Sequence, residues 1–86
     1  MDIKDIVENA KKKLVELTGF TSPSAIGVKK EGETWQIIIE ITEKPSPASN
    51  LDMLGIYEVC LDVNGNLLSY KRENIRKRGD IQRESV

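Results

Sequence analysis

The sequence predicts a two-layer α+β domain in which one N-terminal helix packs on a four-stranded antiparallel sheet in meander order. Three observations predict this fold. Apolar residues recur at helical spacing over residues 3–17, the later segments alternate apolar and polar residues, and Asn64-Gly65 is a strong hairpin signal. The 86 residues have room for a single domain. We expect that domain to span residues 1–79, followed by a flexible tail over 80–86.

The helix is predicted to lie between Asp2 and Gly19. Its apolar residues fall three or four positions apart and its polar residues lie opposite them, so one face packs on the sheet. Asp2 suits the N-cap because its carboxylate can accept a backbone N–H, and Gly19 suits the C-terminal end. Lys11–Lys13 indicate a solvated helix face rather than a nucleic-acid or membrane contact, because Glu8 and Glu16 lie among them.

Two strands are predicted next, over residues 25–30 and 34–42. Thr21–Ser24 is rich in turn-forming residues, and we expect it to form a turn before the first strand. The second strand has the clearest period-two pattern, because Trp35, Ile37, Ile39 and Ile41 alternate with mostly polar residues.

The segment from Lys44 to Leu54 interrupts the strand pattern. Pro45 and Pro47 lack the backbone N–H that a sheet ladder needs, so we expect a loop of about ten residues here. A loop of this length is either a plain crossover or a binding loop, and its residues favour neither interpretation.

The last two strands are predicted over residues 56–63 and 66–74, joined by the two-residue turn Asn64-Gly65. Such a turn fixes the register of the ladder. The predicted pairs are Val63 with Asn66, Leu61 with Leu68, Val59 with Tyr70, Glu58 with Lys71, and Tyr57 with Arg72. In this register the Arg72 guanidinium lies beside the Tyr57 ring, where stacking contributes about 0.5–1 kcal/mol at an exposed site.

The predicted core consists of the apolar residues that these patterns place between the helix and the sheet. It comprises Ile6, Ala10, Leu14, Leu17, Phe20, Ile26, Val28, Trp35, Ile37, Ile39, Ile41, Val59, Leu61, Leu68 and Tyr70.

The charges of the chain are divided unevenly. The segment Lys71–Arg83, which we name the basic strip, has six basic and two acidic residues, a formal charge of +4, against −5 for the rest of the chain. All four arginines of the chain lie in this strip. It is either a docking surface for an acidic partner or a solvated terminus, and the charge pattern alone leaves both open.

The composition argues against catalysis. The chain has no histidine and a single cysteine, which removes histidine-based relays, histidine-ligated zinc and an internal disulfide. Its six glycines are scattered and form no phosphate-binding loop. We therefore expect no catalytic residue, no cofactor and no metal site. No membrane span or signal peptide is apparent in the sequence, and we expect a cytoplasmic protein.

The sequence from Trp35 to Gly79 resembles the gas vesicle protein O family. The resemblance rests on an acid-terminated strand with a tryptophan, a proline-containing loop, the hairpin, and a final arginine segment. The motif residues are Asp52-x-Leu54-Gly55-x-Tyr57-Glu58-Val59-x-Leu61-Asp62, Gly65-Asn66-Leu67, Tyr70-x-Arg72 and Arg78-Gly79. The family's tail usually has an Arg-Tyr pair where this chain has Ile75-Arg76. The layout is also similar to PepSY-type domains.

The resemblance implies a non-catalytic accessory protein of gas vesicle formation that acts through contacts with other accessory proteins or with the shell protein. It also implies association with the gas vesicle. We expect the following residues to bind the partner: Arg72, Arg76, Lys77, Arg78, Tyr57, Asp52 and Leu54.

Two other functions are consistent with the residues. One is a small nucleic-acid-binding module that uses the arginines of the basic strip, which the acidic remainder of the chain and the lack of an aromatic platform disfavour. The other is a self-associating PepSY-like structural domain that pairs through an edge strand or through Ile38. We expect a monomer or a weak dimer.

Overall fold

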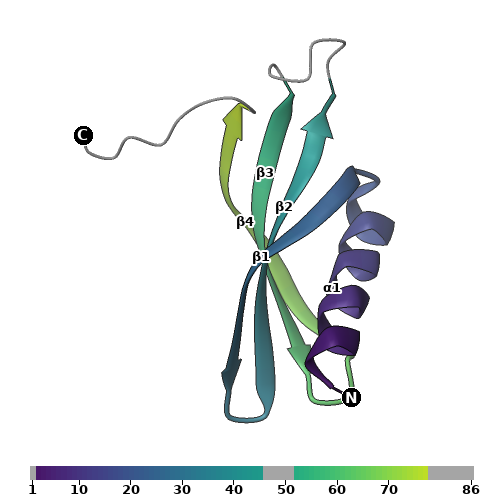
Figure 1. Cartoon of the computed structure of the whole chain (residues 1–86), viewed down its shortest axis with the longest axis vertical. Helices are drawn as coiled ribbons and strands as arrows, with labels where there is room; N and C mark the ends of the chain where they lie inside the picture. The colour runs from purple at the N-terminus through teal and green to yellow at the C-terminus, as the bar shows by residue number, and fades with distance from the viewer. Residues whose placement is uncertain (1, 46–51, 78–86) are drawn as a thin grey trace, which may run out of the picture.

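The fold is one helix packed on a four-stranded antiparallel sheet, which confirms the predicted fold class. The computed structural model describes residues 2–45 and 52–77. The elements are α1 (Ile3–Thr18), β1 (Thr21–Glu31), β2 (Thr34–Lys44), β3 (Met53–Asp62) and β4 (Leu67–Lys77). The sheet order is β1-β2-β3-β4, so each strand pairs with its neighbour in the sequence. Figure 1 shows α1 beside the strongly twisted sheet, whose β2, β3 and β4 project past the C-terminal end of the helix.

Helix α1 begins and ends where the sequence predicts. The Asp2 side chain accepts a hydrogen bond from the Asp5 backbone N–H at 3.0 Å, which satisfies one free donor of the first turn. Gly19 adopts a left-handed conformation with φ of 77°, and its N–H donates to the Val15 carbonyl at 2.8 Å. A side-chain hydrogen bond from Asn9 to the Gly65 carbonyl joins the helix to the β3–β4 turn.

The core consists of side chains of α1, β2 and β3 that pack between the helix and the sheet. Burial of each large apolar side chain contributes about 1.5–3 kcal/mol, so this cluster is the main source of stability. Its fully or nearly fully buried members are Ile6, Ala10, Leu14, Ile37, Ile39, Ile41, Tyr57, Val59 and Leu61. Phe20 and Trp35 pack against them, as does Leu67.

Five predicted core residues are in fact exposed, by 38–55% of their surface: Leu17, Ile26, Val28, Leu68 and Tyr70. Irregularities in the ladders explain two of them. Ile26 lies at the register shift between Ala25 and Gly27, and Leu68 lies opposite the shift between Cys60 and Leu61. A bulge residue leaves the regular alternation, so a strict period-two prediction places it wrongly. Val28 and Tyr70 lie on the two edge strands of the sheet, and β4, which contains Tyr70, has the least contact with α1.

The β3–β4 connection is longer than the predicted two-residue turn. The Asp62 carboxylate accepts hydrogen bonds from the backbone N–H groups of Asn64 and Asn66, both at 2.9 Å, and so organises the turn. Leu61 therefore pairs with Leu67, not with Leu68, and the predicted pairing of Val63 with Asn66 is wrong. Beyond the shift at Leu68 the predicted register is confirmed, because Tyr70 pairs with Val59.

The strands also extend beyond their predicted ends. β1 starts at Thr21, within the segment predicted as a turn, and the deviation there is confined to a register shift and a positive φ of 57° at Ser22. β2 reaches Lys44 and β3 begins at Met53, so the two strands include the outer parts of the predicted loop. The rest of that loop lies outside the described residues.

Candidate functional site

The predicted partner-binding residues fall into three groups. Tyr57 and Arg72 are paired across β3 and β4, in the predicted register. Leu54 is 1% exposed and Asp52 is 9% exposed, so neither offers an open side-chain surface to a partner. Arg76 and Lys77 are the last two residues of β4, and Arg78 lies outside the described residues. The partner-binding role of all these residues stays a prediction.

The Arg72 side chain has an internal partner that sequence reasoning did not identify. Its Nε donates to Glu43 Oε2 at 3.1 Å, and its Nη2 donates to Glu43 Oε1. The Tyr57 hydroxyl also donates to Glu43 Oε2, at 2.9 Å. The Glu43 side chain is only 8% exposed, whereas that of Arg72 is 50% exposed. The bidentate geometry is the one that an arginine and a carboxylate favour.

These interactions shift the acid–base behaviour of the cluster. Burial acts to raise the pKa of Glu43, but the hydrogen bonds from Arg72 and Tyr57, with the Arg72 charge, outweigh burial and hold that pKa below its usual value. Burial raises the pKa of Tyr57, and the hydrogen bond to the Glu43 carboxylate and its charge raise it further. At neutral pH the cluster is therefore an ionised carboxylate between a neutral phenol and a guanidinium cation.

Gly55 provides the space for the Glu43 carboxylate. A Cβ atom at position 55 would collide with the carboxylate and would lie 2.9 Å from the Tyr57 Cε1 atom. Gly55 pairs with Ile41 on one side and with Ile75 on the other, so it lies on an inner strand of the sheet. The absence of a side chain at this position allows a carboxylate from β2 to reach β4 across β3.

Two sheet irregularities orient the residues around this cluster. On β2, the register shift between Thr42 and Lys44 sets Glu43 and Lys44 against the single residue Met53. On β4, Glu73 is the extra residue of a register shift. Arg72 pairs with Tyr57 before the shift, and Ile75 pairs with Gly55 after it. Residues three apart on a regular strand would point to opposite faces. The bulge at Glu73 instead places Arg72 and Ile75 on the same face.

These side chains surround a hollow of about 390 Å³, which we name the Glu43 hollow. It is lined by Phe20, Glu43, Lys44, Met53, Arg72 and Ile75. Phe20 is held at the α1–β1 junction, where its N–H donates to the Thr18 hydroxyl at 3.2 Å. The hollow therefore lies where β2, β3 and β4 extend past the end of α1 (Figure 1). No pattern in the sequence identifies Phe20, Met53 and Ile75 as members of one surface, because the bulges that bring them together are not visible in it.

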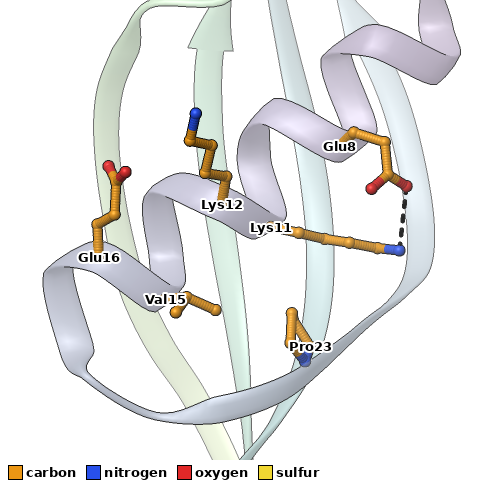
Figure 2. A pocket seen from close by; sticks show the side chains of 6 residues that line it. All are labelled: Glu8, Lys11, Lys12, Val15, Glu16 and Pro23. Carbon is orange, nitrogen blue, oxygen red and sulfur yellow. Dashed lines mark hydrogen bonds and ion pairs between the residues drawn. The ribbon is translucent and has the colours of Figure 1, made fainter.

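A second hollow, of about 410 Å³, lies between α1 and the start of β1. It is lined by Glu8, Lys11, Lys12, Val15, Glu16 and Pro23. Figure 2 shows Lys11 extended toward Glu8, with which it forms an ion pair at 3.2 Å. The acidic and basic side chains are equal in number, so this surface has no net charge to select a partner. It agrees with the predicted solvated face of the helix.

The described part of the chain contains no group of three or more potential metal-ligating side chains. Within residues 2–45 and 52–77, no helix has the length and apolar character needed to cross a bilayer. The free cysteine, Cys60, pairs with Gln36 on β2 and with Ser69 on β4. It lies between the core residues Val59 and Leu61 in β3, so its side chain is on the sheet face away from α1.

Comparison with known proteins gives consistent matches. The family model for the gas vesicle synthesis protein GvpO matches residues 1–82. Gas vesicle protein O of a Streptomyces species is 30% identical over 78 residues, and that of Haloferax mediterranei is 25% identical over 83 residues. These alignments cover 91% and 95% of this chain and 61% and 59% of the two relatives.

Gas vesicle protein O1 of Halobacterium salinarum is 29% identical over 59 residues, which is 69% of this chain and 50% of that relative. The matched part of this chain thus spans between half and about three fifths of the length of these relatives. No solved structure matches the chain. Because the family model covers nearly all of the sequence, this chain belongs to the gas vesicle synthesis protein GvpO family.

Proposed function

We propose that this protein is an accessory factor in gas vesicle formation that acts by binding other gas vesicle proteins and catalyses no reaction. The observation that carries the proposal is the family match over residues 1–82, together with relatives named gas vesicle protein O. It works in the cytoplasm, in association with the forming vesicle.

The binding surface is the basic strip. Arg76 and Lys77 continue β4 beyond the region covered by the helix, and Arg78 follows them directly. Arginine and lysine at the end of an otherwise acidic chain favour an acidic partner surface and steer its approach. Arg72 belongs to the same segment, but Glu43 already occupies two of its N–H groups, so we assign the main docking charges to Arg76, Lys77 and Arg78.

The absence of a catalytic role is supported by the chemistry of the most polar cluster. Glu43 has a lowered pKa and is bonded to two donors, so it is a poor general acid or base near neutral pH. Tyr57 has a raised pKa and stays protonated. The cluster is suited to fixing the end of the sheet, and we assign it that role.

The test is complementation in a gas-vesicle-forming strain from which this gene has been deleted. We expect the full chain to restore vesicles, counted by electron microscopy. We expect a triple variant with Arg76→Gln, Lys77→Gln and Arg78→Gln to accumulate normally yet restore few or none. The matched control carries Lys4→Gln, Lys12→Gln and Lys29→Gln, which remove the same charge from exposed sites elsewhere, and it should restore vesicles fully.

Two results would overturn the proposal. Normal vesicles in the deletion strain would show that the chain has no role in their formation. Equal loss of vesicles with the triple variant and with its control would show that overall charge, and not the basic strip, is what matters.

A further inference from the structure

We propose that the Glu43 hollow is an anchor site for an acidic segment of a partner protein, which inserts one large apolar side chain between Phe20 and Ile75 and places a carboxylate against Lys44 and Arg72. The inference rests on the proposed function and names the chemistry of the partner. It adds a second, partly apolar contact to the docking charges of Arg76, Lys77 and Arg78.

The apolar part of the site comes from three separate segments. Phe20 follows α1, Met53 begins β3 and Ile75 lies near the end of β4, and all three line the hollow. Ile75 is 40% exposed, although aliphatic residues of a strand usually bury more of their surface. An inserted side chain would cover this surface and gain about 25 cal/mol per Å² of apolar area removed from water.

The charged part of the site favours an acidic segment. The lining has two cations, Lys44 and Arg72, and one anion, Glu43, so its formal charge is +1. Glu43 is already neutralised by Arg72, and it occupies only two of the five N–H groups of that guanidinium. Half of the Arg72 side chain is exposed, and Lys44 forms no ion pair with any residue that the structure describes. A carboxylate therefore has two cationic donors within the hollow.

The shape of the hollow favours a protein segment over a small ligand. Its volume of about 390 Å³ is near the lower end of the range for small-molecule sites, about 300–1,000 Å³. Such sites usually enclose most of the ligand, whereas here Arg72 and Ile75 stay substantially exposed. An open hollow with an apolar wall and a cationic rim is typical of a pocket that receives one anchor residue of a larger interface.

Hydrogen bonds hold the residues on two sides of the hollow in place. The contact of Glu43 with Tyr57 and Arg72 fixes β2, β3 and β4 relative to one another, and the cap at Gly19 fixes the position of Phe20. A preformed pocket lowers the ordering cost of binding. The hollow beside Val15 lacks these features, since its charges balance and only Val15 and Pro23 are apolar.

The experiment is an NMR titration of the full ¹⁵N-labelled chain with a defined probe, the blocked peptide Asp-Glu-Leu-Phe-Glu-Asp. We expect amide shifts at Phe20, Lys44, Met53 and Ile75. Two further peptides test the two parts of the proposal: Asp-Glu-Ser-Ser-Glu-Asp lacks the apolar anchor, and Lys-Lys-Leu-Phe-Lys-Lys reverses the charge. Both should bind at least about tenfold more weakly, since each lacks one group of interactions typical of an anchor residue.

Protein variants with matched controls locate the site. Ile75→Glu should weaken binding of the first peptide by about tenfold or more, whereas Leu68→Glu, on the same strand with 54% exposure, should change it less than about twofold. Lys44→Gln should weaken binding several-fold, and Lys12→Gln on the helix should not. Circular dichroism and thermal unfolding check that all four variants keep the fold.

The inference is overturned if the first peptide causes no shifts, if its shifts lie elsewhere, or if the basic peptide binds equally well. Tighter binding of octanoate than of the peptide would also overturn it, in favour of a small anionic ligand. Failure here is distinct from failure of the proposed function. If the Ile75→Glu variant restores vesicles in the deletion strain, the anchor site is wrong and the accessory role stands. If the deletion strain itself forms vesicles, the accessory role is wrong.

Discussion

Glu43 and Arg72 join β2 to β4 although the two strands are not neighbours. The Glu43 carboxylate accepts two hydrogen bonds from the Arg72 guanidinium across β3, and it accepts a third from the Tyr57 hydroxyl. Backbone pairing alone connects each strand only to its neighbour, so this contact is an additional link at the end of the sheet that α1 leaves uncovered (Figure 1). It holds the strands whose ends carry the candidate docking residues.

The first prediction concerns the space above Gly55. Gly55→Ala should destabilise the protein by about 1–3 kcal/mol, because the new methyl group must displace the Glu43 carboxylate and press on the Tyr57 ring. Chemical denaturation measures the change. Gly27→Ala is the control, since a Cβ there would meet Ile38 only at 3.4 Å, and its effect should be smaller. Equal effects of the two substitutions would contradict the role assigned to the Glu43 carboxylate.

The second prediction concerns the Tyr57 hydroxyl. Tyr57→Phe removes the hydrogen bond to Glu43 but keeps the buried ring, so we expect a loss of about 0.5–1.5 kcal/mol of unfolding free energy. Tyr70→Phe is the control, because Tyr70 is 40% exposed and its ring lies tilted beside that of Tyr57, with centroids 6.4 Å apart, without a hydroxyl contact to Glu43. A loss for Tyr70→Phe that matches that for Tyr57→Phe would argue against a specific bond.

How much of this arrangement the sequence predicts depends on which interaction fixes each residue. Periodicity predicts the helix, the strands and the central core residues. Ile37, Ile39 and Val59 are buried, and their alternation with polar residues decides which face of the sheet packs on the helix. The register predicted from the Asn64-Gly65 turn also makes Tyr57 and Arg72 neighbours, and the structure confirms this pair.

The sequence does not predict the partner of Arg72. Glu43 reaches Arg72 because of a bulge in β2 and because Gly55 has no side chain, and both are features of the assembled sheet. For the same reason simple alternation places Leu68 wrongly, because the shift at Leu68 resets the faces of β4, and the shift at Glu73 resets them again before Ile75. Regular patterns in this chain thus predict the core, and the bulges determine the candidate site.

The third prediction is a pH dependence. The pKa of Glu43 in the native protein is lowered from its usual value of 4.5, so the unfolded state binds more protons than the native state in the acid range. The stability from this carboxylate is therefore fully present above about pH 5 and is lost as the pH falls through the lowered native pKa. Comparison with Glu43→Gln isolates it, because other shifted groups such as Asp62 are common to both proteins.

The measurement is urea denaturation of the wild type and of Glu43→Gln between pH 7 and pH 3. We expect the wild type to be more stable by a constant amount near neutral pH, and the difference to shrink steadily as the pH falls below about 5. A difference that is constant over the whole range, or that grows toward acid, would show that ionised Glu43 contributes nothing to stability.

The last prediction separates the structural arginine from the docking cations. Arg72→Gln leaves Glu43, which is 8% exposed, without its cationic partner, so thermal stability should fall. Arg72→Lys should restore stability only in part, because an ammonium group lacks the planar fork that reaches both carboxylate oxygens.

Lys71→Gln is the control one residue away, since its contacts with Glu58 and Glu73, at 3.8 and 3.5 Å, are solvent-exposed ion pairs of small energetic effect. If Arg72→Gln and Lys71→Gln unfold at the same temperature, the Glu43–Arg72 contact does not stabilise the sheet.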